Sequence, residues 1–329
     1  MKLSSSLVLL STLACASAFA PSKFGVAQSS VTSTSLFGAV TPKEIKALRD
    51  ATGAGMMDCK KALLETDGDI EAASDFLRKS GLIKADKKSV RIAAEGKIAA
   101  ATSSDGKKVL VEINCETDFV AKDQNFATFA EKVAEAAASM DAEDDIDALM
   151  AATVDDQKLE DYRQAMVAKI GENIQVRRYA SVGGTGTTVG SYIHMNRIGV
   201  MVELEGGTEE VAMSVAMHVA AMNPQFATPD DVDEAVLEKE RQILTEQALD
   251  SGKPKEIVEK MVEGRIRKYL EEICLVSQAF VKDTDKTVGQ MLKENGATMK
   301  GFKRIAVGEG IEKKQEDFAA EVAKAAGKA

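Results

Sequence analysis

One order of secondary-structure elements occurs twice in this chain, and this repeat limits the possible folds more than any other feature of the sequence. Each copy begins with two strand-like runs, which predict two strands joined by a turn. A helix, a later helix and one further strand complete the copy. The predicted strands are 95–101, 107–115 and 173–180, then 189–195, 199–205 and 298–307. Two small sheets covered by helices predict an α+β fold with two related halves, core subdomain one at 95–182 and core subdomain two at 183–311.

Helical spacing of apolar residues places the helices of the two halves. Phe126 and Phe129 mark the helix of the first half, and Val211 and Val215 mark the corresponding helix of the second. The later helix of the second half is predicted at 286–294.

A small helical bundle is predicted over 39–83. Thr41 and Glu44 form the pattern of a capping box, with Pro at the first helical position. Two further short helices follow, and Gly81 is predicted to end the third. Three short helices in about 40 residues resemble the ubiquitin-associated type of bundle. The Lys-rich segment 84–94 is predicted to be a solvated linker that is helical in part.

The second half carries a large insertion, which predicts an antiparallel coiled-coil hairpin at 229–273. Thr228 begins a helix with the same pattern as Thr41, and a break at 251–254 separates it from a second helix. The alternative is two ordinary helices packed on the body of the protein. The two apolar stripes are Val232, Val236, Leu237, Ile243 and Leu244, then Val258, Val262, Ile266, Tyr269 and Ile273.

The last residues, 312–329, carry Phe318, Val322 and Ala325 on one helical stripe. A helix this short is marginal by itself and needs a surface to lie on. We therefore predict a carboxy-terminal helical module.

The amino-terminal residues 1–38 have the composition of a targeting segment. No acidic residue precedes Glu44, and an apolar run over 3–14 leads to Ala16-Ser17-Ala18, which is typical of a signal peptide and its cleavage site. The Ser/Thr-rich stretch 19–38 has the composition of a transit peptide. The junction, Ala-Ser-Ala-Phe-Ala-Pro, resembles the motif of bipartite plastid presequences in algae with secondary plastids. The predicted destination is the plastid stroma, and the alternative is the mitochondrial matrix; a secretory leader fits badly with unpaired cysteines.

Charge and motif content exclude several classes of function. The net charge is −10, and cleavage of the presequence makes the mature chain more acidic still, so direct nucleic-acid binding is not expected. Four Cys without a Cys-x-x-Cys pair and two isolated His argue against a bound metal. No phosphate-binding loop or nucleophile motif occurs, so we expect no catalytic residues, no cofactor and no small-molecule substrate. No later apolar run is long enough for a membrane span, so no membrane contact of the mature form is expected.

Two residues with reactive side chains have structural explanations. His218 lies in an apolar helical segment, where packing is the expected role. Cys115 has the acidic neighbours Glu116 and Asp118, which raise rather than lower the pKa of a thiol. A reactive cysteine is therefore not expected.

The segment 114–123 is unusual because it joins a strand end directly to a helix start. Thr117 or Asp118 can cap the helix. Phe119 precedes Phe126 by seven residues, so in one continuous helix both would share a buried stripe. The alternative is an aromatic side chain presented to a partner at the tip of the corner.

Long motifs in this chain resemble the elongation factor Ts family. Residues 48–63, read as Leu-Arg-Asp-Ala-Thr-Gly-Ala-Gly-Met-Met-Asp-Cys-Lys-Lys-Ala-Leu, are similar to its amino-terminal signature, and 116–121 to its second signature. Further similar stretches are 170–174, 197–200, 217–221, 252–257 and 307–313, so the resemblance runs from about residue 41 to the end. Gln278-Ala279-Phe280 departs from the family's Gln-Pro-Phe. The retained hairpin indicates the bacterial-like type.

The resemblance implies a guanine-nucleotide exchange factor for elongation factor Tu, bound in its GDP and nucleotide-free forms. In the family, a Thr-Asp-Phe-Val segment enters the nucleotide domain of Tu and dislodges Mg²⁺. By motif match these residues are Thr117, Asp118, Phe119 and Val120, and the match favours the partner role of Phe119. The alternative function is a ribosome- or RNA-associated interaction module without exchange activity.

Overall fold

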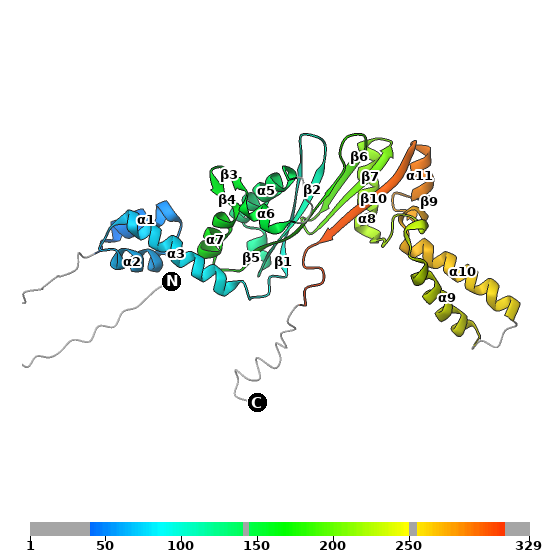
Figure 1. Cartoon of the computed structure of the whole chain (residues 1–329), viewed down its shortest axis with the longest axis horizontal. Coiled ribbons are helices and arrows are strands. Elements are labelled where there is room, and N and C mark those ends of the chain that lie inside the picture. The colour runs from blue at the N-terminus through cyan, green and yellow to red at the C-terminus, as the bar shows by residue number, and fades with distance from the viewer. Residues whose placement is uncertain (1–39, 141–144, 250–254, 313–329) are drawn as a thin grey trace, which may run out of the picture. The chain divides into compact units, whose positions relative to one another are not determined.

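A computed structural model describes residues 40–140, 145–249 and 255–312 (Figure 1). The predicted presequence at 1–38 lies outside the described residues, as does the predicted carboxy-terminal module beyond Glu312. The described residues form helices and small antiparallel sheets, which confirms the α+β class.

The two larger sheets have three strands each and the same topology, as the repeat predicts. In each, the second strand in chain order lies in the middle and pairs antiparallel with both neighbours. The first sheet contains β1 (Glu95–Thr102), β2 (Lys108–Cys115) and β5 (Ile174–Val182). The second contains β6 (Thr188–His194), β7 (Ile198–Gly206) and β10 (Ala297–Ala306).

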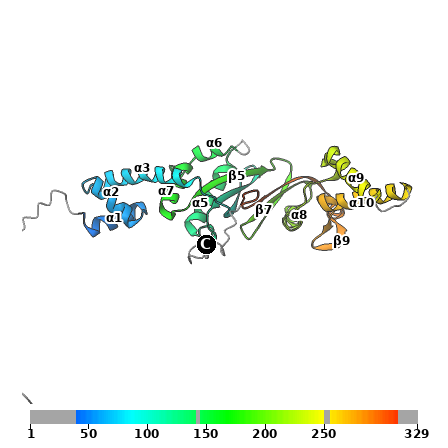
Figure 2. The ribbon, with the colours of Figure 1, turned by 90° about the horizontal axis from the view of Figure 1, so that it is seen from below.

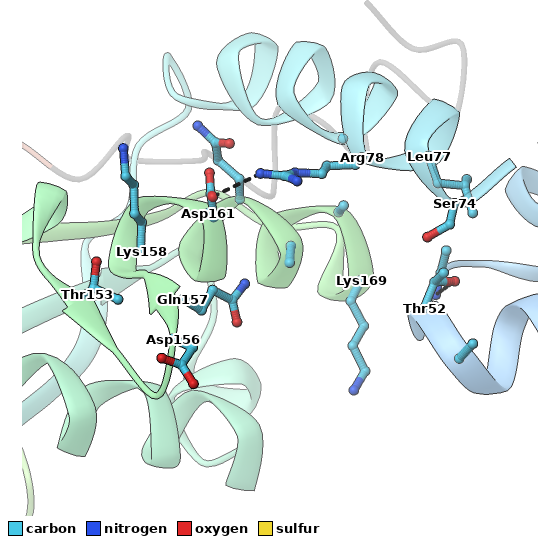
Figure 3. A pocket seen from close by; sticks show the side chains of 16 residues that line it. Thr52, Ser74, Leu77, Arg78, Thr153, Asp156, Gln157, Lys158, Asp161 and Lys169 are labelled. Carbon is cyan, nitrogen blue, oxygen red and sulfur yellow. Dashed lines mark hydrogen bonds and ion pairs between the residues drawn. The ribbon is translucent and has the colours of Figure 1, made fainter. Parts of the chain in front are cut away.

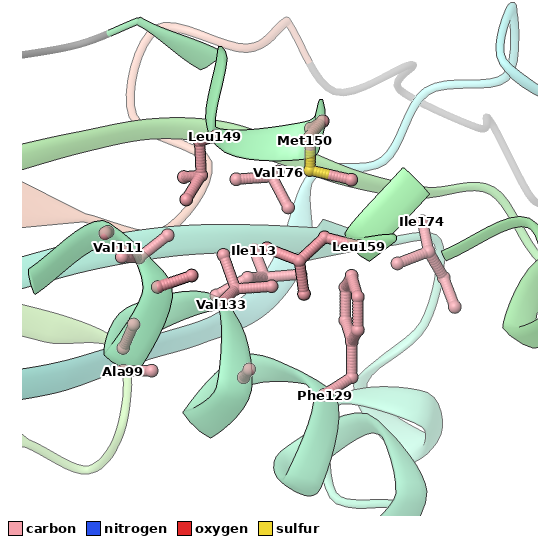
Figure 4. Packing of buried hydrophobic residues seen from close by; sticks show 14 of the residues in the cluster. Ala99, Val111, Ile113, Phe129, Val133, Leu149, Met150, Leu159, Ile174 and Val176 are labelled. Carbon is pink, nitrogen blue, oxygen red and sulfur yellow. The ribbon is translucent and has the colours of Figure 1, made fainter. Parts of the chain in front are cut away.

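The core of the first half lies between its sheet and a helical layer (Figure 4). Helix α5 (Gln124–Ala138) packs on β1 and β2, and α6 (Ile146–Ala151) and α7 (Leu159–Ile170) complete the layer. Phe129 and Val133 of α5 meet Val111 and Ile113 of β2 in this cluster, and Leu159 joins them from α7. A two-stranded ribbon, β3 (Thr153–Val154) and β4 (Gln157–Lys158), precedes α7.

The second half repeats this layering with α8 (Glu209–Met222) on β6 and β7. The later helix, α11 (Val288–Glu294), begins two residues after the predicted start at 286. Residues before it form β9 (Asp283–Thr287), which pairs with β8 (Ala279–Phe280) after the short 3-10 helix η2 (Leu275–Ser277). Thr287 explains the later start, because its hydroxyl accepts from Gln290 in a capping box.

The two sheets contact each other through a small apolar cluster of Ile98, Leu110, Met201 and Ile305. Gly199 lies in this contact, where a Cβ atom would be only 2.7 Å from Ile98 Cγ2. A buried carboxylate reinforces the contact. Glu112 of β2 accepts from Arg178 Nε at 2.6 Å, Arg177 Nη1 at 3.1 Å and Gly308 N at 2.8 Å, and Gly308 follows β10.

The amino-terminal bundle consists of α1 (Pro42–Thr52), α2 (Met56–Glu65) and α3 (Ile70–Lys88) around a core that includes Leu48 and Leu63. The capping box of Thr41 and Glu44 is present. Assignment of this bundle to the ubiquitin-associated type stays a prediction.

The predicted end of the third helix at Gly81 is wrong, because α3 continues to Lys88 and covers the first part of the predicted linker. The reason is tertiary packing: α3 contacts α7, and both Gly81 and Ala85 are buried (Figure 2). Glycine inside a helix costs only about 1 kcal/mol, which such a contact outweighs.

The insertion forms α9 (Glu234–Leu249) and α10 (Lys255–Ile273), which pack antiparallel. Leu237 near the start of α9 meets Ile273 at the end of α10, while Ala248 meets Val258 at the opposite ends. Two details differ from the prediction. Residues 229–231 form a separate 3-10 turn, η1 (Pro229–Asp231), before α9, and the side chains of Val236 and Ile243 are exposed, so the seam follows Leu237 and Leu244.

Candidate interaction site

The segment 117–120 forms a sharp corner between the first sheet and its covering helix. β2 ends at Cys115, and a single helical turn, α4 (Asp118–Ala121), begins after Thr117. The Thr117 hydroxyl accepts the Val120 N–H at 3.4 Å, which makes Thr117 the amino-terminal cap. Helix α5 then starts separately, because Asp123 Oδ1 accepts from Asn125 N at 2.8 Å as a second cap.

This break decides how Phe119 is placed. The pattern-based interpretation that Phe119 shares the buried stripe of Phe126 is wrong, because two helices meet at 122–123 and the spacing across them is not helical. Phe126 is fully buried, whereas the side chain of Phe119 is 80% exposed. Its neighbour Val120 is 8% exposed and belongs to the core of the first half.

Glu172 holds the corner from a distant part of the chain. Its carboxylate accepts from the Thr117 N–H at 3.0 Å and from the Thr117 hydroxyl at 2.7 Å. Glu172 lies in the short connection between α7 and β5. Because strand β5 pairs with β2, this connection comes directly beside the corner.

A second carboxylate makes the reciprocal contact. Glu116 Oε1 accepts from Asn173 N at 2.6 Å and pairs with Arg91 Nη1 at 3.4 Å. The buried Asn173 side chain donates to the Arg91 carbonyl at 2.7 Å and to that of Ser89 at 3.3 Å. The corner is thereby tied to the segment that follows α3.

Asp118 is half-exposed and stays ionised at neutral pH. Its carboxylate accepts from Lys122 Nζ at 2.7 Å, and this hydrogen bond lowers the pKa of Asp118, with smaller contributions from the charges of Lys122 and Arg197. The corner therefore presents an apolar ring beside a negative charge.

Cys115 is buried below the corner. Burial, together with the negative charges of Glu172 and Glu95, raises its pKa to about 12. Its Sγ lies 3.2 Å from the Thr117 carbonyl, to which the thiol donates. The direction of this pKa shift agrees with the sequence-based expectation, but it comes from burial, Glu172 and Glu95 and not from the sequence neighbours Glu116 and Asp118.

His218 serves packing, as predicted. Its Nδ1 accepts from Val281 N at 3.2 Å, so Nε2 carries the proton and donates to Gln278 Oε1 at 2.9 Å. The ring is fully buried, and burial lowers its pKa.

The corner contacts that sequence reasoning missed come from Glu172, Asn173 and Arg91. Their links to Thr117 and Glu116 span 25 to 57 positions, and no spacing rule connects residues so far apart. The available signal was the similarity of 170–174 to the elongation factor Ts pattern.

Other features of the described part offer no competing site. A cavity of about 850 Å³ opens between α3 and α7, but it is lined by exposed or half-buried side chains, and the ion pair of Arg78 with Asp161 crosses it at 3.1 Å (Figure 3). Within residues 40–140, 145–249 and 255–312, no group of three His, Cys, Asp or Glu side chains could hold a metal ion. None of the helices there is long and apolar enough to cross a membrane.

A fixed corner that exposes an aromatic side chain is the arrangement of a protein-binding surface, because aromatic anchors supply much of the energy at interfaces. The fold and the corner thus indicate a two-sheet α+β binding protein. Comparison with known proteins identifies the family: the model of "Elongation factor TS" matches residues 116–309. The chain is 57% identical over 285 residues to the elongation factor Ts of Alkalilimnicola ehrlichii, covering 86% of this chain and 97% of that protein.

Two further relatives give the same result. The elongation factor Ts of Thioalkalivibrio sulfidiphilus is 55% identical over 285 residues, with 86% of this chain and 97% of that protein covered. That of Halorhodospira halophila is 54% identical over 284 residues, with the same coverage. The chain belongs to the elongation factor Ts family, the translation elongation factors of that name, and these relatives are bacterial.

Proposed function

We propose that this protein binds elongation factor Tu with GDP and promotes release of the nucleotide, so that GTP can bind in its place. The segment Thr117–Val120 enters the nucleotide domain of Tu and displaces Mg²⁺. The observation that carries this proposal is the 80% exposure of Phe119 on a corner whose backbone is held by half-buried hydrogen bonds to Glu172.

Exchange of this kind needs no catalytic group on this chain. The protein must bind nucleotide-free Tu more tightly than Tu with GDP, and by linkage GDP weakens its binding by the same ratio. A thousandfold weakening of GDP binding corresponds to about 4 kcal/mol of differential binding. One desolvated aromatic anchor supplies about 2 kcal/mol or more, so Phe119 is responsible for a large part of the difference.

Each residue of the segment has a separate role in this proposal. Phe119 acts as an apolar wedge. Asp118 places a negative charge near the metal site, where it competes for cationic and hydrogen-bonding groups. Thr117 caps α4, and Val120 fixes the turn to the core.

The test is the rate at which a fluorescent GDP analogue leaves purified plastid-type Tu. We expect Phe119→Ala to slow the stimulated release about thirtyfold, which corresponds to about 2 kcal/mol. Met222→Ala is the control, because it also removes an exposed apolar side chain but lies at the end of α8, outside the modules given a contact role. Release by Phe119→Ala at the wild-type rate would refute the proposal, and binding of RNA by the wild-type protein would instead support the interaction-module alternative.

The remaining modules add contact area in this proposal. They are the ubiquitin-associated-like bundle at 39–83, the coiled-coil hairpin at 229–273 and the carboxy-terminal module at 312–329. Core subdomains one and two, at 95–182 and 183–311, set the distance between these surfaces.

We further propose that residues 1–38 direct the protein to the plastid stroma. A fluorescent protein fused to residues 1–45 is expected to accumulate in the plastid. Deletion of 19–38 from this fusion leaves only the signal-peptide part and should leave the fluorescence in the secretory pathway. Accumulation of the intact fusion in mitochondria would refute the plastid assignment.

A further inference from the structure

The half-buried carboxylate of Glu172 binds a single residue of the corner. Both of its oxygens accept from one residue, Thr117, at 3.0 Å and 2.7 Å. Within the described residues, Glu172 forms no ion pair. Its charge is therefore used to hold the backbone and hydroxyl of Thr117, and charge-assisted hydrogen bonds of this kind are the stronger ones in proteins.

Every polar group of Thr117 is engaged as a result. Its N–H and hydroxyl donate to Glu172, and its hydroxyl oxygen accepts from Val120 N. Its carbonyl accepts from the Cys115 thiol and from Ala121 N, the latter at 3.3 Å. Thr117, two residues before Phe119, cannot rotate its backbone without breaking several of these contacts.

The turn that carries Phe119 depends on such contacts. Helix α4 has four residues, which is far below the length at which a helix is stable by itself. Phe119 is mostly exposed and so contributes little packing to fix the turn. A segment that is ordered before binding avoids the entropy cost of ordering on association, and this raises affinity without any new contact.

We propose that Glu172 is a positioning residue for exchange: it holds Thr117, and thereby keeps α4 in the conformation that presents Phe119 to Tu. This inference rests on the proposed function. It adds a positioning residue outside the segment 117–120, and it predicts that Glu172 acts mainly through the ring of Phe119.

Glu172→Ala removes both contacts to Thr117, and we expect it to slow stimulated GDP release about tenfold. Glu172→Gln is expected to stay within about threefold of the wild type. Its amide oxygen can still accept the Thr117 N–H, and its NH₂ can donate to the Thr117 hydroxyl oxygen. Glu131→Ala, an exposed glutamate of α5, is the matched control and should release GDP at the wild-type rate.

A double-mutant cycle separates positioning from a general structural effect. In a Phe119→Ala background, Glu172→Ala should slow release far less than it does in the wild-type background, because the ring that it positions is absent. Amide hydrogen exchange supplies a readout that needs no Tu: exchange at the Thr117 N–H should accelerate at least tenfold in Glu172→Ala and stay unchanged in Phe119→Ala. Thermal unfolding of each variant, followed by circular dichroism, verifies that it is folded.

The outcomes distinguish this inference from the proposed function. If Phe119→Ala slows release but Glu172→Ala does not, the positioning role is wrong and the proposed function stands. The positioning role is also wrong if Glu172→Ala slows GDP release by the same factor in the Phe119→Ala background as in the wild-type background. If Phe119→Ala releases GDP like the wild type, the proposed function is wrong. The positioning role is then tested by amide hydrogen exchange alone: an unchanged exchange rate of the Thr117 N–H in Glu172→Ala would overturn it.

Discussion

Substitution by Ala should have different effects at two adjacent residues of the corner. At Val120 it should lower the stability of the protein, and at Phe119 it should slow GDP release. Val120 is 8% exposed and packed in the core, whereas Phe119 is 80% exposed. Changing either to Ala places the same residue in the same helical turn, so the helix propensity of the new residue is equal in both variants. The difference between them therefore reports burial alone.

The expected magnitudes follow from the buried area. Val120→Ala removes two buried methyl-sized groups at about 0.8 kcal/mol each and leaves a small cavity, for a total loss of about 2 kcal/mol. At about 2–4 °C per kcal/mol for a chain of this size, Tm falls by about 4–8 °C. Phe119 has only a fifth of its side chain covered, so Phe119→Ala costs less than about 0.6 kcal/mol.

Thermal and urea unfolding, each followed by far-ultraviolet circular dichroism, measure the changes in Tm and in unfolding free energy, since the chain contains no Trp for fluorescence. GDP release from Tu, measured on the same samples, should be slowed strongly by Phe119→Ala and only slightly by Val120→Ala. The reasoning is refuted if Phe119→Ala loses several degrees of Tm, because the ring would then be part of this protein's own core.

Three further changes test the fold around the site. Gly199→Ala places a Cβ about 2.7 Å from Ile98 Cγ2 and should destabilise by about 1–3 kcal/mol in urea unfolding; an unchanged midpoint would show that the sheets can separate there at no cost. Glu112→Ala leaves two arginines without their shared buried carboxylate and should cost about 3 kcal/mol, whereas a loss below 1 kcal/mol would contradict the role given to this residue. Burial lowers the pKa of His218 from 6.5, so the unfolded chain takes up the proton first: stability should be full above about pH 6.5 and fall as pH decreases below it. His218→Asn should flatten that fall between pH 6.5 and 5, and an identical pH profile would assign it to other groups.

Much of the fold could be predicted from the sequence because it depends on local patterns. Strand positions follow from short apolar runs bounded by turn residues, and the repeat of elements predicts two sheets of equal topology. The capping box at Thr41 sets a helix start through contacts within four residues. These signals depend on short-range geometry, which a single sequence contains.

The errors occur where long-range packing outweighs local signals. Gly81 is a good helix terminator by itself, but contact with α7 carries α3 past it. Val236 and Leu237 are adjacent apolar residues, and only the position of α10 decides which of them enters the seam.

The candidate site was predictable in part for the same reason. The motif located Thr117–Val120, but spacing alone wrongly placed Phe119 in the core because a second cap at Asp123 interrupts the helix. The hydrogen bond between Glu172 and Thr117 joins residues 55 positions apart, so no local sequence pattern predicts it.

The central claim is that Phe119 acts by dislodging Mg²⁺ from Tu, and its dependence on the metal tests this most directly. The measurement is the ratio of GDP release rates stimulated by wild-type protein and by Phe119→Ala, first with saturating Mg²⁺ and then with EDTA. We expect a ratio of about thirty with Mg²⁺ that falls towards one with EDTA, because no metal is then left to displace. A large ratio that persists in EDTA would contradict displacement of the metal as the action of this residue.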